Sequence, residues 1–333
     1  MDKASDKAAP SVCIILLNYN GATITYKGES ILKLTLDSIR KQDYGNSKLI
    51  VVDNGSSDNS KELIRRYKPD LVDIKDNIYN FSAVNNIAIK YAIRTYDPTY
   101  LLLMSNDVFL SSKNFVRSLV NSAIASKAGI TSSRLMIPSE HGFKQQEVPA
   151  HSANAACFLI SQKTLRNVGL LDENFVMGSE DSDYWIRTRN SGQKMIVDDH
   201  AKAVHLVSYT IREDKDRLKL SEHDKRMHFY YWKRNNMYFI RKHTDEYGPL
   251  PLFKEIALYF ASISFGVRRT RKNRRTFSIE KKRPYSYIPI VFKSILSALT
   301  MKEFDTRFNL SYKHDRRIKY WRFTNSGYVQ KHK

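Results

Sequence analysis

The chain has 333 residues, of which 42% are hydrophobic, and this is enough apolar material to fill one large domain with an appendage, or two domains. The composition therefore argues against a disordered protein. The formal net charge is +21, and Arg212 to Lys333 alone carry 30 Lys and Arg against 12 Asp and Glu, an excess of 18. This asymmetry predicts a catalytic or binding domain followed by a segment that meets an anionic partner, either a membrane or a nucleic acid.

The sequence also bears on the location of the protein and on the state of its two cysteines. We find no pattern of a basic, then apolar, then small-residue leader, so we expect residues 1–10 to be a flexible polar tail and the protein to stay in the cytoplasm. Cys13 and Cys157 both lie in apolar runs, where we expect free buried thiols and not a disulfide or a zinc site.

The first hundred residues alternate between strand and helix patterns. Residues 12–18, 49–53 and 99–104 are aliphatic runs without alternation, as in parallel strands that are buried on both faces. Helical patterns lie between them at 29–42, 59–67 and 82–95. This order predicts a doubly wound α/β sheet, in which ligands bind at the carboxyl ends of the strands.

Beyond residue 130 the pattern becomes mixed and then helical. A helix that ends at Gly192 is expected over 179–192. Strands are expected at 130–137, 155–160, 194–199 and 202–207. From residue 216 onward the chain is expected to be helical and basic.

We divide the chain accordingly. Residues 1–10 form the tail, and 11–215 form a catalytic or binding domain with two halves, 11–110 and 111–215. Residues 216–333 are predicted to be a basic, mainly helical C-terminal region that can bind a membrane surface.

Three polar clusters fall where predicted strands end, at 18–21 (NYNG), 53–58 (DNGSSD) and 105–107 (SND). Because the carboxyl ends of parallel strands meet at one edge of a sheet, we expect these side chains to lie together. The Asp107 carboxylate beside neutral oxygens suits a hard divalent cation that shares a diphosphate. Taken singly, each cluster is more simply explained as a polar turn or a helix cap.

A fourth cluster, Glu180-Asp181-Ser182-Asp183, opens the predicted helix at 179–192. Acids in a first helical turn interact favourably with the helix dipole, which is a purely structural alternative. Adjacent helical residues point in different directions, so one carboxylate could act as a base while its neighbour supports it. His205 lies in a strand pattern, where a semi-buried structural histidine and a metal ligand are both possible.

Together these stretches resemble glycosyltransferase family 2, the inverting GT-A enzymes, and most closely its rhamnosyltransferase-like members. The resemblance covers about residues 10–245. It rests on motifs that occur in the family's order: NYNG at 18–21, VDNGSSDNS at 52–60, NxxNFSAVNN at 77–86, SNDV at 105–108, VGLLDENF at 168–175, EDSDYWIR at 180–187, AVH at 203–205 and the run FYYWKRNNMYFIRKH at 229–243.

The resemblance implies a GT-A type doubly wound mixed sheet with flanking helices, followed by a basic helical extension. It also implies a set of side chains that bind the nucleotide-sugar: Asn18, Tyr19, Asn20, Asp53, Asn54, Asn77, Asn86, Asn106 and Asp107. By the same resemblance, Asp107 and His205 would hold a divalent cation, Mn²⁺ or Mg²⁺, although Ser105 stands where the family usually has Asp or Asn. Asp181 matches the catalytic base and Glu180 its neighbour. The resemblance makes 11–110 the nucleotide-binding half and 111–215 the acceptor half of a catalytic domain, and the acceptor side would be formed by Asn154, Trp185 and Arg187.

The reaction implied is transfer of a sugar from a UDP- or dTDP-linked donor to a hydroxyl of a glycan or lipid-linked acceptor, by a metal-assisted single displacement that inverts the anomeric centre. A sugar nucleotidyltransferase is an alternative, but it should carry a Gly-rich, Arg/Lys-bearing loop after the first strand, and NYNGATITYKGE is a poor version of one. A non-enzymatic RNA- or membrane-binding protein with a degenerate transferase domain is the other alternative.

Two apolar segments, 252–267 and 287–301, flank the basic clusters RRTRKNRR at 268–275 and KKR at 281–283. Each segment is shorter than the roughly 20 residues that span a bilayer. We expect amphipathic helices on an anionic membrane surface, where each basic residue contributes about 1 kcal/mol, and a peripheral location on the inner face of the cell membrane. Core helices with a solvated basic loop, or an RNA-facing surface, are the alternatives; we expect no nucleic acid. The oligomeric state is not predicted.

Overall fold

The computed structural model describes residues 9–139, 141–146, 155–176, 178–206, 222–265, 288–311 and 315–331. They form two compact units, which are described separately. The first unit contains the described residues of Met1–Asp172, Asp181–Leu218 and Thr306–Lys333. The second contains those of Glu173–Glu180 and Lys219–Asp305.

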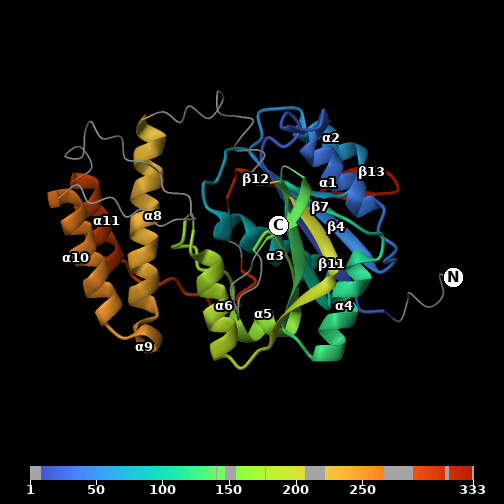
Figure 1. Ribbon diagram of the computed structural model, residues 1–333. Helices are drawn as coiled ribbons and strands as arrows, with labels where there is room; N and C mark the ends of the chain where they lie inside the picture. The colour runs from blue at the N-terminus through green and yellow to red at the C-terminus, as the bar shows by residue number, and fades with distance from the viewer. Residues whose placement is uncertain are drawn as a thin grey trace. The chain divides into compact units, whose positions relative to one another are not determined.

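Four parallel strands form the centre of the first unit (Figure 1). In spatial order they are β5 (Asp70–Ile74), β4 (Ser47–Asn54), β1 (Val12–Asn18) and β6 (Tyr100–Ser105). Their aliphatic residues are buried on both faces, as unalternating runs predict. The strands therefore end on one common edge, and the polar clusters of the sequence lie at that edge.

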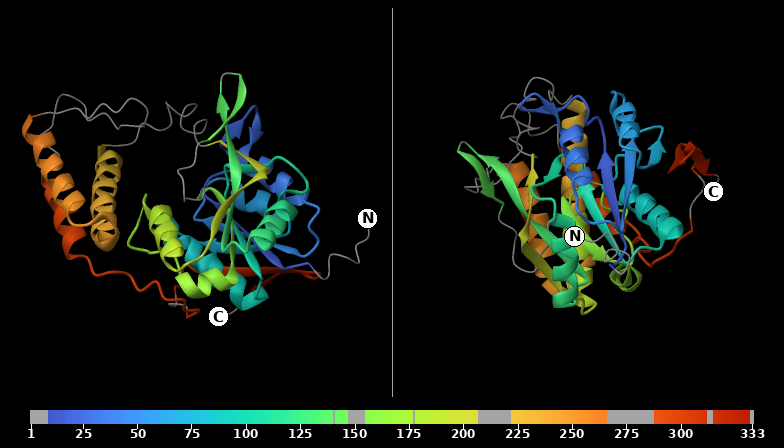
Figure 2. Two further views of the ribbon diagram at one scale, coloured as in Figure 1. Left: turned by 60° about the horizontal axis from the view of Figure 1, so that its bottom comes forward. Right: turned by 90° about the vertical axis from the view of Figure 1, so that its right-hand side faces the viewer.

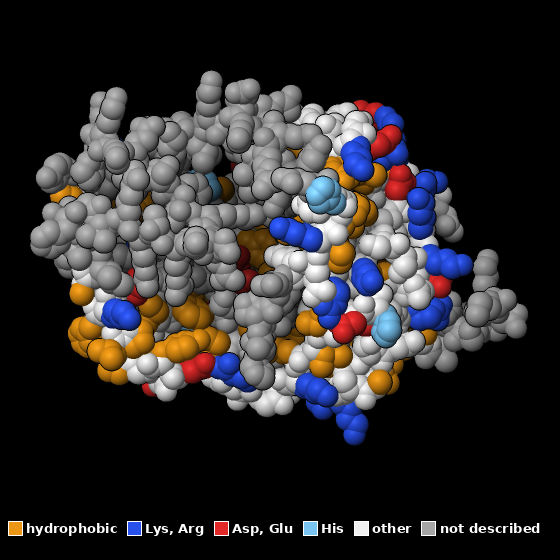
Figure 3. Space-filling view, viewed as in Figure 1, with side chains coloured by type: hydrophobic (Ala, Val, Ile, Leu, Met, Phe, Trp, Pro, Cys, Tyr) orange, Lys and Arg blue, Asp and Glu red, His pale blue; other side chains and the backbone are white. Residues whose placement is uncertain are grey.

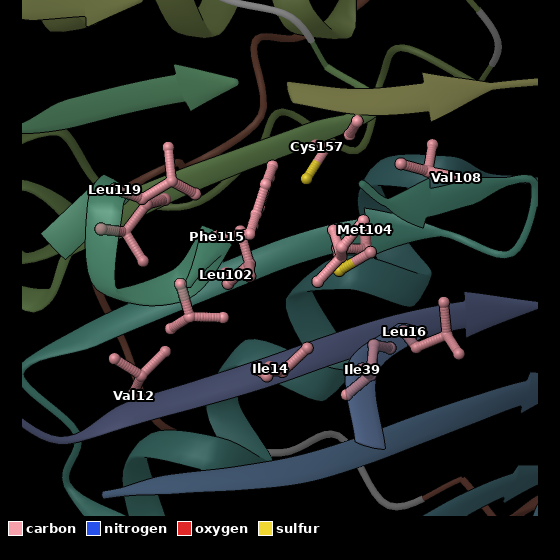
Figure 4. Packing of buried hydrophobic residues seen from close by; sticks show 14 of the residues in the cluster. Val12, Ile14, Leu16, Ile39, Leu102, Met104, Val108, Phe115, Leu119 and Cys157 are labelled. Atoms are coloured by element: carbon pink, nitrogen blue, oxygen red, sulfur yellow. The ribbon is translucent and has the colours of Figure 1, made fainter. Parts of the chain in front are cut away.

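Helices cover both faces of this sheet. On one face, Ile14 and Leu16 of β1 pack in a core with the helices α1 (Ile31–Arg40), α2 (Ser60–Arg66) and α4 (Phe115–Ser126) (Figure 4). On the other face, Cys13 and Ile15 pack with α3 (Phe81–Tyr96), α5 (Gln162–Val168) and α6 (Glu180–Asn190). Alternate residues of one strand thus face two helical layers.

Both cysteines are buried and free, as predicted, and burial raises the pKa of each thiol to about 12. At neutral pH they are therefore protonated and behave as small apolar groups.

The second half of the sheet is mixed, as expected for the GT-A type. Strand β10 (Cys157–Ser161) runs antiparallel to β6 and to β8 (Ile130–Ser139). Beyond β8 lie β11 (Met195–His205), which is parallel to it, and β7 (Val108–Leu110), which is antiparallel to β11. Strand β9 (Gly142–Gln145) pairs with β8. The strands predicted at 194–199 and 202–207 are one strand, β11, with a register shift between Asp198 and Lys202.

The link between β1 and α1 folds into a small hairpin of β2 (Thr25–Tyr26) and β3 (Glu29–Ser30). The Ser30 hydroxyl accepts a hydrogen bond from the Lys33 amide and caps α1. The hairpin gives this long link regular antiparallel pairing.

The C-terminal residues from Thr306 onward belong to the first unit, so the predicted region 216–333 contains a strand hairpin in addition to its helices. Strands β12 (Ile318–Thr324) and β13 (Gly327–Lys331) form a hairpin, and β12 pairs antiparallel with β5 at the edge of the sheet (Figure 2). The buried Asp70 carboxylate fixes this hairpin, because it accepts hydrogen bonds from the Phe323 amide at 3.1 Å and from the hydroxyls of Tyr91 at 2.8 Å and Tyr96 at 2.5 Å.

The second unit is helical. Its helices are α8 (Glu222–Lys242), α9 (Thr244–Tyr247), α10 (Leu250–Phe265) and α11 (Ile288–Thr300). The predicted segments 252–267 and 287–301 correspond to α10 and α11. Among the described residues, no helix combines the length and the apolar character that crossing a bilayer requires.

A small core holds the second unit together, formed by Phe175, Met237, Tyr238, Val291 and Ala298. Phe175 belongs to the stretch 173–180, so this stretch joins the helices although it lies between two segments of the sheet unit in the sequence. The predicted basic clusters 268–275 and 281–283, and residues 1–8 of the predicted tail, lie outside the described residues.

Candidate functional site

The ends of three strands are joined by side-chain hydrogen bonds. Asn18, at the end of β1, donates to the Asp53 carboxylate of β4 at 2.9 Å. Asn106, which follows β6, donates to the Asn18 side-chain oxygen at 2.8 Å. Clusters that lie 35 and 88 residues apart in the chain therefore meet at one edge, as the strand pattern predicted.

Asp53 lies fully buried at the centre of this edge. Its Oδ1 accepts hydrogen bonds from the Asn18 amide at 2.9 Å and the Ser56 hydroxyl at 2.6 Å, and its Oδ2 accepts from the Ser56 amide at 3.1 Å. Burial raises the pKa of Asp53, and the hydrogen bonds and the nearby Lys61 ammonium offset part of that rise. The result is a carboxylate held rigidly in a polar cradle.

Asp107 and His205 also meet, although they lie far apart in the sequence. Strand β7 begins at Val108 and pairs with β11 so that His205 is the register partner of Val108. The Asp107 carbonyl accepts a hydrogen bond from the Leu206 amide at 2.9 Å. As a result, Asp107 Oδ2 and His205 Nε2 lie 3.4 Å apart.

This pair fits a weakly held divalent cation. A carboxylate oxygen and an imidazole nitrogen are both ligands of Mn²⁺, and among the described residues the buried His205 Nδ1 has no hydrogen-bond partner. Within the described ranges, no group of three or more His, Cys, Asp or Glu side chains could hold a metal. A cation here would therefore need oxygens from a bound diphosphate to complete its coordination.

Asn20, Asn54 and Asn77 shape the loops around the edge. The Asn54 amide donates to Asn77 Oδ1 at 2.8 Å and accepts from the Ile78 backbone N–H at 2.9 Å. Asn20 accepts from the Ser57 amide at 2.8 Å. Tyr19, by contrast, leaves 47% of its surface exposed at the rim. The predicted nucleotide-binding set thus contains both loop-holding amides and an exposed aromatic side chain.

Asn86 lies in α3, and its side chain forms hydrogen bonds within the protein. Its side chain donates to the Leu171 carbonyl at 2.9 Å and accepts from the Leu171 amide at 3.1 Å, in the manner of a paired strand residue. Only 1% of its surface is exposed. These bonds give Asn86 a structural role in fixing the chain after α5.

Glu180 and Asp181 open α6 after a turn in which Gly178 and Ser179 both have positive φ. Asp181 Oδ1 accepts hydrogen bonds from the Ser182 amide at 2.6 Å and from its hydroxyl at 3.2 Å. In the part of the chain that the structure describes, Asp181 makes no hydrogen bond or ion pair with Asp53, Asp107 or His205. The base assignment therefore remains a prediction.

Trp185 and Arg187 are occupied by structural contacts. The Trp185 ring is 5% exposed and packs edge-on against Phe158, with ring centroids 5.1 Å apart. Arg187 donates to the carbonyls of Val168 at 2.9 Å and Leu170 at 3.0 Å. These contacts account for both side chains without an acceptor. Asn154, the third predicted acceptor residue, lies outside the described residues.

Two residues at this edge were not predicted from the sequence. Ser56 holds both oxygens of Asp53, and its place in the turn DNGSS was a usable signal. Lys61 lies 2.8 Å from Asp73 and 3.7 Å from Asp53, and nothing in its local sequence distinguishes it from a surface lysine.

The fold and the polar edge define the class of doubly wound α/β proteins of the GT-A type. The chain belongs to the family "Glycosyl transferase family 2", whose model matches residues 13–184, and this confirms the family prediction made from the motifs. The match also decides against the sugar nucleotidyltransferase alternative.

A curated relative and several solved structures are similar to the chain. The relative is the low-salt glycan biosynthesis hexosyltransferase Agl10 of Haloferax volcanii, which is 22% identical over 201 residues. That alignment covers 53% of this chain and 64% of the relative, slightly less than two thirds of its length.

Two of the solved structures show the fold. The S. aureus TarS fragment 1–349 in complex with UDP-GlcNAc has a TM-score of 0.54 and 14% identity, over 86% of this chain and 81% of that one. The mannosyltransferase PcManGT of Pyrobaculum calidifontis, in complex with GDP-Man and Mn²⁺, has a TM-score of 0.50 and 14% identity, over 90% and 78%. Both likenesses confirm the GT-A fold that the motifs implied.

Proposed function

We propose that the protein is an inverting glycosyltransferase that moves a sugar from a UDP- or dTDP-linked donor to a hydroxyl of a glycan or lipid-linked acceptor. Family membership and the hexosyltransferase relative support sugar transfer. The observation that carries the proposal for this chain is the hydrogen-bonded edge of Asn18, Asp53 and Asn106 beside the Asp107–His205 pair. Structural neighbours in complex with GDP-Man and UDP-GlcNAc support a nucleotide-sugar as the donor.

Different residues of this edge would bind different parts of the nucleotide-sugar. Asp53 would accept the N–H of the base, because a carboxylate is purely an acceptor. Asp107 and His205 would hold the divalent cation, which when bound neutralises the diphosphate as it leaves. The exposed Tyr19 ring would lie along the nucleoside at the rim.

Asp181 would take the proton from the acceptor hydroxyl. Its Oδ1 is held by Ser182, and among the described residues its Oδ2 has no hydrogen bond, so one oxygen is fixed and the other is available to a ligand. One carboxylate is enough for a single displacement, because no covalent intermediate forms. The sugar would therefore be transferred with inversion of its anomeric configuration. Glu180, its neighbour in the first turn of α6, would support it.

The test is a panel of UDP-, dTDP- and GDP-sugars, each with and without Mn²⁺ or Mg²⁺, in which nucleotide release and the anomeric configuration of the product are measured. We expect metal-dependent release from a UDP- or dTDP-sugar, and a loss of about 100-fold or more in Asp181→Asn, the usual size of a general-base contribution. Full turnover by Asp181→Asn would remove Asp181 from the mechanism. A product of retained configuration would contradict the single displacement.

We also propose that the protein acts in the cytoplasm while bound to the inner face of the cell membrane. The helical unit exposes apolar side chains on two helices, and Figure 3 shows hydrophobic side chains gathered on its visible face. On α11 these are Phe292, Leu296 and Leu299, spaced so that they share one side of the helix, while Val291 and Ala298 pack in the core. Leu250 and Phe253 of α10 are also exposed, at 74% and 65%.

The charge between these helices supports an anionic surface as the partner. Residues 266–287 contain nine Lys and Arg and one acidic residue. Flotation with vesicles of phosphatidylcholine, with and without phosphatidylglycerol, tests this. We expect binding to require the anionic lipid and to weaken in the double variant Phe292→Ser, Leu296→Ser, but not in Ile124→Ser, which changes an equally exposed side chain of the sheet unit. Equal flotation with neutral vesicles would contradict the proposal.

A further inference from the structure

Lys61 lies between two carboxylates at the nucleotide edge. Its Nζ is 2.8 Å from Asp73 Oδ1 and 3.7 Å from Asp53 Oδ2. Asp53 and Asp73 are register partners on the parallel strands β4 and β5, so their side chains lie next to each other. Lys61 comes from the first turn of α2, which follows β4 directly.

The two oxygens of Asp53 are not equivalent. Oδ1 is occupied by the donors of Asn18 and Ser56. Among the described residues, Oδ2 receives one hydrogen bond, from the Ser56 amide, and Lys61 lies beyond hydrogen-bonding distance of it. Oδ2 is therefore the oxygen with fewer donors from the protein, and it is the one that faces the Lys61 ammonium.

The chemistry of recognition requires Asp53 to be ionised. The imide N–H of uracil or thymine is a donor, which an ionised carboxylate accepts and a protonated carboxyl opposes with its own O–H. Asp53 is fully buried, and burial penalises its charge. The charged groups that face it are the Lys61 ammonium from α2 and, through that lysine, the Asp73 carboxylate of β5, whereas β1 presents the neutral Asn18.

We propose that Lys61 is a positioning residue that keeps Asp53 in its acceptor form for the imide N–H of a pyrimidine base, and that Asp73 anchors the Lys61 side chain between the two strands. The proposal rests on the donor site described above. Lys61 is 28% exposed, so its ammonium reaches the site from the solvent side and its effect is partly screened.

The role of Lys61 can be separated from ordinary packing by its pH dependence. Without the ammonium, Asp53 retains a proton to a higher pH, so nucleotide binding should be weakest in acid and recover as pH rises through the pKa of Asp53. A rise of one unit in that pKa lowers the ionised fraction about tenfold on the acid side. A purely structural loss would weaken binding equally at every pH.

The experiment titrates UDP and dTDP into the protein by calorimetry, without metal, from about pH 4, near the ordinary pKa of an aspartate, to about pH 8. For Lys61→Met we expect about tenfold weaker binding at the acid end and nearly normal binding at the alkaline end. Lys61→Arg should keep the wild-type profile. Asp73→Asn removes a negative charge beside Asp53 while its side-chain oxygen can still accept from Lys61, so it should shift the profile in the opposite direction to Lys61→Met, toward lower pH. Lys48→Met, at the exposed amino end of β4, is the matched control and should change nothing.

Identical profiles for Lys61→Met and the wild type would overturn the role of Lys61 and leave the donor site intact. A loss of equal size at all pH values, shared by Lys61→Arg, would make Lys61 a structural residue and would also overturn the proposal. If the wild-type protein bound neither nucleotide at any pH, the proposed donor site would be contradicted, and so would the role of Lys61 that rests on it.

Discussion

Replacing Asn18 by aspartate tests whether the three strand ends really meet. Asn18→Asp keeps the shape of the side chain but sets a second carboxylate 2.9 Å from Asp53 Oδ1, at a site with no exposed surface. Two charges at that distance repel each other by about 6 kcal/mol at an effective dielectric constant of about 20. Keeping one carboxyl protonated at pH 7, against a normal pKa of about 3.9, costs about 4 kcal/mol. Protonation is the smaller cost, so we expect a loss of about 4 kcal/mol in unfolding free energy at pH 7.

The sign of the pH dependence follows from the same numbers. The folded variant holds one proton that the unfolded chain has released, because the folded pair has a raised pKa. Its unfolding free energy therefore falls by about 1.4 kcal/mol for each unit of rising pH, relative to the wild type. The variant is therefore closest to the wild type in stability at low pH, and its deficit grows with rising pH until pH passes the folded pKa of the pair. Near pH 5 the expected loss is about 1.5 kcal/mol.

Urea unfolding followed by circular dichroism between about pH 5 and about pH 7.5 measures both quantities. Asn309→Asp is the control, because Asn309 is exposed and its side-chain oxygen already accepts from the Ser311 amide, a role that aspartate retains. If Asn18→Asp were as stable as the wild type at pH 7, with no difference in pH slope, the two side chains would not be neighbours and the described edge would be wrong.

Two further substitutions test the return of the C-terminal segment to the sheet unit. Gly169→Ala should lower the unfolding free energy by about 3 kcal/mol or more, because Gly169 has φ of +90° and a methyl group would collide with the Thr306 carbonyl. The control is the exposed Gly142→Ala, which has a positive φ but open space around it and should cost about 1 kcal/mol. Equal losses in thermal unfolding would contradict the contact between Gly169 and Thr306. Asp70→Asn should lower the unfolding free energy by about 2–4 kcal/mol, because it removes a charged acceptor from Tyr91, Tyr96 and the Phe323 amide. The local measurement is the rate of proteolysis of the C-terminal hairpin, which should increase. An unchanged rate would show that the hairpin is held by other contacts.

The sequence was sufficient for the central sheet because its signals are local. The runs 12–18 and 99–104 have the uninterrupted aliphatic character of strands buried on both faces, and the polar residues that end them mark the binding edge. The hairpin of β12 and β13 was missed for the opposite reason. Its partner β5 lies more than 240 residues earlier, and the basic composition around it favoured a helical, surface-bound region.

The candidate site shows a different limit. Asn18 and Asn86 are both buried asparagines in family motifs, but one joins two strand ends and the other satisfies the backbone of Leu171. An amide suits either task, so its residue type cannot distinguish a ligand contact from internal support. Arg187 is a similar case, because its guanidinium binds two carbonyls of its own chain. Lys61 was missed because only the register of β4 and β5 brings its partners together.

The most direct measurement of the central claim is the affinity for UDP and dTDP with and without Mn²⁺, in the wild type and in Asp107→Asn. A donor edge completed by Asp107 and His205 predicts that Mn²⁺ strengthens nucleotide binding in the wild type and that the substitution abolishes this gain while leaving the metal-free affinity nearly unchanged. If Mn²⁺ strengthened binding equally in both proteins, or in neither, the pair beside Asp53 would not be the place where the diphosphate and its cation bind.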